Sequence, residues 1–96
     1  MEQENAQCVR HHNICGELAE LYQKKNHDYG DSYHKSFLKW GWPMAAIRLE
    51  DKLNRFETLI KSDGEVKDET MRDTLLDLAN YSIMAILELD AGKENW

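Results

Sequence analysis

The chain has 96 residues and a mass of 11.3 kDa, which is the size of a single domain. Apolar residues make up 42% and charged residues 31% of it, a balance that argues against intrinsic disorder. The formal net charge of −6 disfavours a protein that coats duplex DNA, because such proteins present a basic surface. A local basic cluster can still hold a small phosphorylated ligand. A chain this short buries only about 60–65% of its unfolded surface, so we expect a homo-oligomer whose subunits complete each other's site.

Cysteine usage and the distribution of charge predict the compartment. Cys8 and Cys15 are seven residues apart, about 10.5 Å along a helix, which is too far for a disulfide. We therefore expect free thiols in or near the core, and a cytoplasmic protein. Residues 1–25 carry charges throughout, unlike a signal peptide. Residues 75–89 are apolar but interrupted by polar side chains, so we expect a core helix there and no membrane partner.

The spacing of apolar residues predicts three long helices. The first covers roughly residues 4–25, and the second runs from near Pro43 to about Lys61, followed by a glycine-containing stop at residues 62–64. The third covers about residues 68–89 and is apolar nearly all round in its second half, so it should be central or lie at an interface. We expect residues 91–96 to fray. The core-facing positions are Ile14, Cys15, Leu18, Ala19, Leu21 and Tyr22 in the first helix, Leu49, Leu53, Phe56 and Ile60 in the second, and Leu75, Leu78, Ser82, Ala85 and Leu89 in the third, with Leu76, Ala79, Ile83 and Ile86 beside them.

An aromatic-rich segment separates the first two long helices. Residues 27–42 hold five of the nine aromatic side chains, and a turn predicted at residues 26–30 precedes a short helix that carries Tyr33, Phe37 and Trp40. One interpretation is a hydrophobic plug that closes a small core. The other is a ligand-facing surface, because nucleobases stack on aromatic faces with about 1–3 kcal/mol per base.

A row of cations marks the second long helix. Arg48, Lys52 and Arg55 follow each other at i, i+4 and i+7, so they share one face. The row is either a solvated surface linked by ion pairs to Asp51, or a site for phosphate, whose oxygens match the arginine fork. On the same helix Glu50, Asp51 and Asn54 offer oxygen ligands for a hard cation such as Mg²⁺.

The third helix carries acids within an apolar sequence. Asp73, Asp77 and Asn80 lie at i, i+4 and i+7, with Tyr81 beside them. A carboxylate on an apolar helix is unfavourable unless it is paired or binds a metal. Asp77 therefore either pairs with a cation of the second helix or helps to hold Mg²⁺ and a diphosphate. Both interpretations predict that the cationic row packs against this acidic row. The four histidines show no zinc-binding spacing.

Three motifs together resemble a known family. They are K-x-x-D-Y-G at residues 25–30, R-x-x-D-K-x-x-R at residues 48–55 and D-x-x-x-D-x-x-N-Y at residues 73–81, with Phe37 between the first two. Over about residues 20–90 the chain resembles a small phage and prophage family, nucleotide modification associated domain type 1. The resemblance implies a nucleotide or nucleotide-derived ligand, and the cytoplasm of the host cell if the gene belongs to a phage.

That family is similar in pattern to the all-α nucleoside triphosphate pyrophosphatases of the MazG-like and dimeric dUTPase-like group. These are helical bundles that assemble as dimers or tetramers and hold Mg²⁺ with an E-E-x-x-E motif and an E-x-x-D motif. The resemblance implies that residues 50–54 stand at the first motif and residues 77–80 at the second, with Asn54 and Asn80 in place of acids.

We therefore expect an all-α fold, a small MazG-like bundle of three long helices and one short aromatic-rich helix, forming one nucleotide-binding domain over residues 1–96 with its core at about 4–90. The first functional hypothesis is a Mg²⁺-dependent (deoxy)nucleotide phosphohydrolase of nucleotide metabolism or DNA modification. The second is a binding protein that captures a nucleotide or nucleotide signal without turnover and counters host defence. The third is a purely structural helical protein.

The site residues of the first two hypotheses come from the motifs. The catalytic residues would be Glu50, Asp51 and Asp77, and the Mg²⁺ ligands Glu50, Asp73 and Asp77. The ligand-binding residues would be Lys25, Asp28, Tyr29, Phe37, Arg48, Lys52, Arg55, Asn80 and Tyr81.

Overall fold

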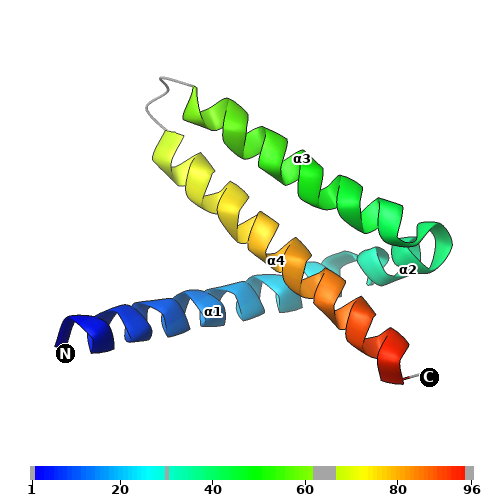
Figure 1. The fold of residues 1–96 in the computed structure, drawn as a ribbon, viewed down its shortest axis with the longest axis horizontal. Coiled ribbons are helices and arrows are strands. Elements are labelled where there is room, and N and C mark those ends of the chain that lie inside the picture. Colours follow the sequence, from blue (N-terminus) through cyan, green and yellow to red (C-terminus); the bar gives the residue numbers. More distant parts are fainter. Residues whose placement is uncertain (1, 30, 62–66, 95–96) are drawn as a thin grey trace. The chain divides into compact units, whose positions relative to one another are not determined.

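The computed structural model describes the backbone of residues 2–29, 31–61 and 67–94 and the side chains of residues 5–29, 31–61 and 70–92. Within these ranges the chain forms four α-helices and no strand: α1 (Glu2–Tyr29), α2 (Ser32–Trp40), α3 (Trp42–Ile60) and α4 (Lys67–Glu94) (Figure 1). The predicted all-α fold, with three long helices and one short one, is confirmed. No helix in the described ranges is long and apolar enough to cross a lipid bilayer.

The chain divides into two compact units, Met1–Asp31 and Ser32–Trp96. The first unit is α1, which is longer at both ends than predicted. The expected turn shifts to Asp31, which takes the left-handed φ of 60° and donates its backbone N–H to the Asn26 carbonyl at 3.3 Å. A backbone bond of this span is typical of the end of a helix. That the whole chain is one domain stays a prediction.

Both cysteines are free and exposed, so the prediction of core thiols is wrong. Cys8 and Cys15 lie on α1, and no second helix belongs to the same unit to cover them. Of the stripe that periodicity predicted on this helix, Leu18 is buried and Leu21 and Tyr22 are half-buried, whereas Ile14, Cys15 and Ala19 are exposed.

A glycine separates α2 from α3. Gly41 takes a φ of 73°, its N–H donates to the Phe37 carbonyl at 2.7 Å, and its own carbonyl accepts from the Met44 N–H at 3.1 Å. Pro43 follows in the first turn of α3, as predicted, where its fixed φ suits a helix start. Phe37 and Trp42 meet edge to face across this corner, with ring centroids 4.9 Å apart.

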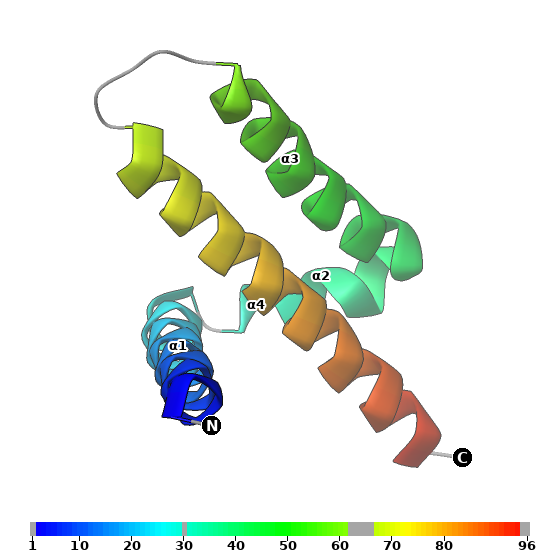
Figure 2. The ribbon, with the colours of Figure 1, turned by 60° about the vertical axis from the view of Figure 1, so that its left-hand side comes forward.

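In the second unit α3 and α4 lie side by side and antiparallel, and α2 contacts both (Figures 1 and 2). The buried side chains of this hairpin are Met44, Ala45 and Leu59 on α3, and Thr74, Leu76 and Asn80 on α4. Besides Met44, the side chains of α3 that are buried or half-buried recur at i, i+4, i+7, i+11 and i+14, and are Ala45, Leu49, Lys52, Phe56 and Leu59. These residues form the face of α3 that packs against α4.

Several predicted core positions are wrong. Leu53 and Ile60 on α3 are 45% and 50% exposed, and Leu75 and Leu89 on α4 are 44% and 46% exposed. The helical spacing of apolar residues was predicted correctly. However, α3 packs against α4 with the flank that includes Lys52, so the apolar stripe of α3 is only partly covered. Residues 91–94 continue α4 instead of fraying, whereas the predicted stop at residues 62–64 and the last two residues lie outside the described part of the chain.

Candidate functional site

An ion pair brings the cationic row of α3 to the acidic row of α4. Lys52 Nζ lies 3.2 Å from Asp77 Oδ2. Because a helix turns by about 100° per residue, Arg48 and Arg55 lie within about 60° of Lys52, on the same flank of α3. Asp73 and Asn80 lie within about 60° of Asp77 on α4 by the same rule. We call this flank of the hairpin, made of Arg48, Lys52, Arg55, Asp73, Asp77 and Asn80, the polar face.

The side chains of the polar face differ in how deeply they are buried. The side chains of Lys52 and Asp77 are 31% and 26% exposed, so their ion pair is half-buried. Asn80 is buried, at 8% exposure, and Arg48, Arg55 and Asp73 are exposed. The predicted packing of polar row on polar row is therefore correct, and Lys52 is a cation that pairs with Asp77. The two arginines stand at the rim, where a ligand can reach them.

Helix α2 adds aromatic and titratable groups next to the polar face. The Tyr33 ring stacks on that of Tyr81, with centroids 6.0 Å apart and an interplanar angle of 28°. His34 Nδ1 lies 2.6 Å from Glu88 Oε1, and the Glu88 side chain is only 10% exposed. Glu88 lies two turns beyond Tyr81 on the same side of α4. In the sequence, the position of Glu88 inside an apolar stretch could have identified it as a buried acid in need of a partner.

The Tyr33 hydroxyl is buried and has no hydrogen-bond partner among the described residues. Burial, together with the nearby charge of Glu88 and the Tyr81 hydroxyl, raises the pKa of Tyr33 above its usual value of 10.0. The positive charge of Arg48 acts in the opposite direction. Arg48 is therefore close enough to influence this hydroxyl, which links the polar face to α2.

Of the three predicted magnesium ligands, Asp73 and Asp77 share the polar face, but Glu50 does not join them within the chain. Glu50 precedes Lys52 by two residues and thus lies about 160° away around α3, on the far side from Asp77. Glu50, Asp51 and Asp73 are all exposed. Among the described residues no three histidine, cysteine or acidic side chains form a group that could hold a metal ion. The described residues of the chain offer no such group for Mg²⁺, so we derive no chemical step through a metal.

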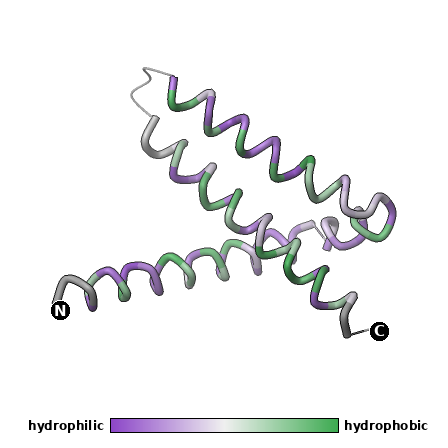
Figure 3. The backbone as a smooth tube through the Cα atoms, viewed as in Figure 1, coloured by the Kyte–Doolittle hydropathy of each residue, from purple (hydrophilic) through white to green (hydrophobic). Residues whose placement is uncertain are grey.

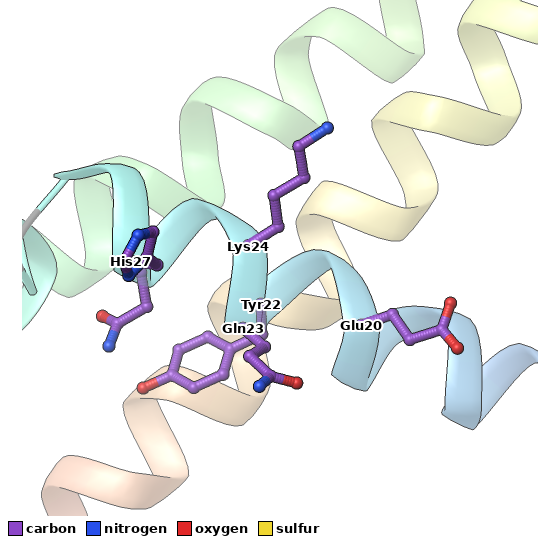
Figure 4. Close-up of a pocket in the computed structure, with 6 residues that line it drawn as sticks. Glu20, Tyr22, Gln23, Lys24 and His27 are labelled. Carbon is purple, nitrogen blue, oxygen red and sulfur yellow. The ribbon is translucent and has the colours of Figure 1, made fainter.

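The first motif lies in the other unit. Lys25, Asp28 and Tyr29 are exposed on α1, and Tyr29 reaches 69%. Nearby, an open depression of about 670 Å³ is lined by Glu20, Tyr22, Gln23, Lys24, Asn26 and His27 (Figure 4). Figure 4 shows Lys24 and Glu20 pointing in different directions from a single helix. A ligand cannot be enclosed by one helix alone, so this depression by itself is not a binding site.

The comparison with known families decides the identity. The model of the family described as nucleotide modification associated domain 1 matches residues 25–89. The chain belongs to this family. No curated protein and no solved structure matches it. The matched range contains all of α2 and α3 and most of α4, so every residue of the polar face lies within the nucleotide modification associated domain.

Proposed function

We propose that the chain binds a nucleotide, or a phosphorylated compound derived from one, on the polar face and the adjoining tyrosines. The observation that carries this proposal is the Lys52–Asp77 ion pair, because it fixes the flank on which Arg48 and Arg55 stand. The name of the family, nucleotide modification associated domain 1, supports the same class of ligand. Binding without turnover is the form of the hypothesis that the geometry supports best.

Phosphate would be held by the three cations. The fork of an arginine side chain bonds two phosphate oxygens at once, and a lysine adds a point charge. Arg48 and Arg55 are exposed on either side of Lys52, and all three belong to one flank of α3. Counted with Asp51, which lies within about 60° of both arginines, this flank holds three cations and three carboxylates and is neutral in a chain whose net charge is −6. A phosphate is attracted to such a face in preference to the rest of the surface.

The base would lie against the Tyr33–Tyr81 pair. A nucleobase can extend an existing stack of aromatic rings, and every base offers a face for this. Asn80 carries an amide on the same flank, and amides can read the edge of a base.

Hydrolysis of the nucleotide with Mg²⁺ and kinship with the MazG-like pyrophosphatases stay predictions from the resemblance. Asp77 alone of the proposed catalytic residues lies in the polar face, and its carboxylate neutralises Lys52. Capture of a nucleotide signal needs only the three cations of the polar face and the Tyr33–Tyr81 pair, and these lie close together.

Isothermal titration calorimetry of the whole chain tests the proposal. The titrants are deoxynucleoside mono- and triphosphates, cyclic mononucleotides and pyrophosphate. We expect at least one of them to bind, and Arg48→Ala and Arg55→Ala each to weaken binding about tenfold, as the loss of a charge-assisted hydrogen bond does.

The matched control is Lys35→Ala, which removes an exposed cation of α2 outside the polar face and should leave the affinity unchanged. Far-UV circular dichroism verifies that each variant is folded. Absence of binding to every titrant, or equal weakening by Lys35→Ala and Arg48→Ala, would contradict the proposal.

A further inference from the structure

Helix α1 carries four side chains of the kinds that bind transition metals, and all four lie on one stripe. They are Cys8, His11, His12 and Cys15. At 100° per residue they span only about 100° of the circumference of the helix. Hydrophilic and hydrophobic residues alternate along α1 (Figure 3), so this stripe is not a continuous apolar contact surface. No two histidines of the chain are four residues apart, but His11 and His12 each have a cysteine at that distance.

The structure brings His11 and Cys15 together. Cys15 Sγ lies 3.8 Å from His11 Nδ1. Residues at i and i+4 stand above each other on adjacent turns of a helix, so the backbone of α1 alone holds the two side chains in this relationship. Both residues belong to the unit Met1–Asp31, and their geometry is therefore set within that unit.

The separation of these two atoms suits a metal ion between them. Zn²⁺ binds a thiolate at about 2.3 Å and an imidazole nitrogen at about 2.0–2.1 Å, and a tetrahedral angle between the two bonds puts the ligand atoms about 3.6 Å apart. The 3.8 Å of this structure is close to that value, so a small side-chain movement is enough. Arg10, the adjacent cation in the sequence, lies about 100° from His11 and about 140° from Cys15 around α1, so its charge is turned away from the pair.

We propose that His11 and Cys15 form a two-residue chelate for a soft divalent transition-metal ion such as Zn²⁺. Thiolate and imidazole select ions of this class, whereas Mg²⁺ requires oxygen ligands. On binding, the Cys15 thiol gives its proton to the solvent and its sulfur bonds the metal as a thiolate, while the neutral imidazole binds through Nδ1.

The chelate is an open site that is separate from the polar face. No three side chains of the metal-binding kinds come together in the described part of the chain, so water would complete the tetrahedron. Residues 11 and 15 lie outside the range 25–89 that the family model matches. The inference therefore does not depend on the proposed nucleotide binding.

Titration of the whole, reduced chain with Co²⁺ tests the inference, because Co²⁺ occupies zinc sites and absorbs light. We expect a thiolate-to-cobalt charge-transfer band that saturates at about one ion per chain and that Zn²⁺ removes by displacement. Cys15→Ser should abolish the band. His11→Asn should weaken Co²⁺ binding at least about tenfold, since even the partner of a metal ligand contributes that much. The matched control is Cys8→Ser, which removes a thiol two turns earlier on α1 and should leave the band and the affinity unchanged.

A second variant tests the spacing at constant composition. His11→Asn combined with Asn13→His moves the histidine to a position about 160° from Cys15 around α1, and should bind Co²⁺ as weakly as His11→Asn alone. Far-UV circular dichroism verifies that each variant is helical. A wild-type chain without the charge-transfer band would overturn the proposal and leave the contact as a hydrogen bond between thiol and imidazole. A band that Cys8→Ser lowers as much as Cys15→Ser does, or a spacing variant that binds as tightly as wild type, would overturn the assignment to His11 and Cys15.

Discussion

His34 and Glu88 are 54 residues apart in the chain, yet the imidazole Nδ1 of one lies 2.6 Å from the carboxylate of the other. The contact attaches α2 to α4. Because Tyr33 precedes His34, the same contact holds the Tyr33 ring against Tyr81 and its hydroxyl near Arg48. The aromatic part of the candidate site therefore depends on a pair that lies outside the polar face.

Replacing His34 by Ala should lower the free energy of unfolding by about 1–2 kcal/mol. The Glu88 side chain is 10% exposed, so the variant leaves a nearly buried carboxylate without its imidazole partner. Urea unfolding followed by circular dichroism measures the change. Glu88→Gln, which retains an oxygen acceptor for His34, is the milder companion and should lose less. Equal stability of wild type and His34→Ala would show that the pair does not hold α2.

Replacing Tyr33 by Phe should have the opposite effect on stability. It removes a buried hydroxyl that has no partner among the described residues, so we expect unchanged stability or a gain of up to about 1 kcal/mol. The same variant should bind the nucleotide ligand about as tightly as wild type, because the hydroxyl is buried and the ring that stacks on Tyr81 is retained. Tyr29→Phe, at a ring that is 69% exposed, is the control for the stability measurement. A clear loss of stability in Tyr33→Phe would mean that the hydroxyl is already bonded.

The raised pKa of Tyr33 predicts how stability depends on alkaline pH. In the unfolded chain this tyrosine loses its proton near pH 10, whereas in the folded chain it keeps the proton to a higher pH. The unfolded state therefore binds fewer protons in this window, and the free energy of unfolding falls as pH rises from about 10 to the folded pKa. Urea unfolding across this range should show a smaller fall in Tyr33→Phe than in wild type. Parallel curves for the two proteins would contradict the prediction.

The helices and the pairing of polar rows could be predicted because each depends on a local pattern. A period of 3.6 identifies a helix, and an acid such as Asp77 within an apolar helix implies a cation nearby. Which flank of each helix becomes buried could not be predicted, because the sequence of one helix does not determine the position of the helix that packs on it. Lys52 lies in the contact between α3 and α4, and this turns Leu53 and Ile60 outward.

Contacts between segments far apart in the chain could not be predicted from the sequence either. Neither His34 nor Glu88 belongs to a motif, and their approach depends on the corner at Gly41 and on the register of α3 and α4. Glu50 shows the converse case. Its place in a family-like motif suggested a metal ligand, but a position two residues before Lys52 puts it on the other side of α3.

Asp77→Asn should separate the two roles of the Lys52–Asp77 pair. The pair is half-buried, so its loss should lower the free energy of unfolding by about 0.5–1 kcal/mol. The same change removes a negative charge from the polar face and frees the Lys52 charge for phosphate, so nucleotide binding should tighten. Thermal unfolding and calorimetry on the same sample measure both effects. Weaker binding in Asp77→Asn would contradict a phosphate site at Lys52 and favour a direct role of the carboxylate.

Removal of divalent metal should leave nucleotide binding nearly unchanged. The phosphate charge is met by Arg48, Lys52 and Arg55, whereas Glu50 is turned away from Asp77 and does not join it in a metal site within one chain. Calorimetry in EDTA and in excess Mg²⁺ should therefore give affinities within about twofold of each other, which corresponds to about 0.4 kcal/mol. A metal that bridged phosphate and protein would add far more binding free energy than this. Release of pyrophosphate or phosphate is followed in the Mg²⁺ sample. Binding that requires Mg²⁺, or release that Asp77→Ala abolishes, would restore the phosphohydrolase hypothesis over capture without turnover.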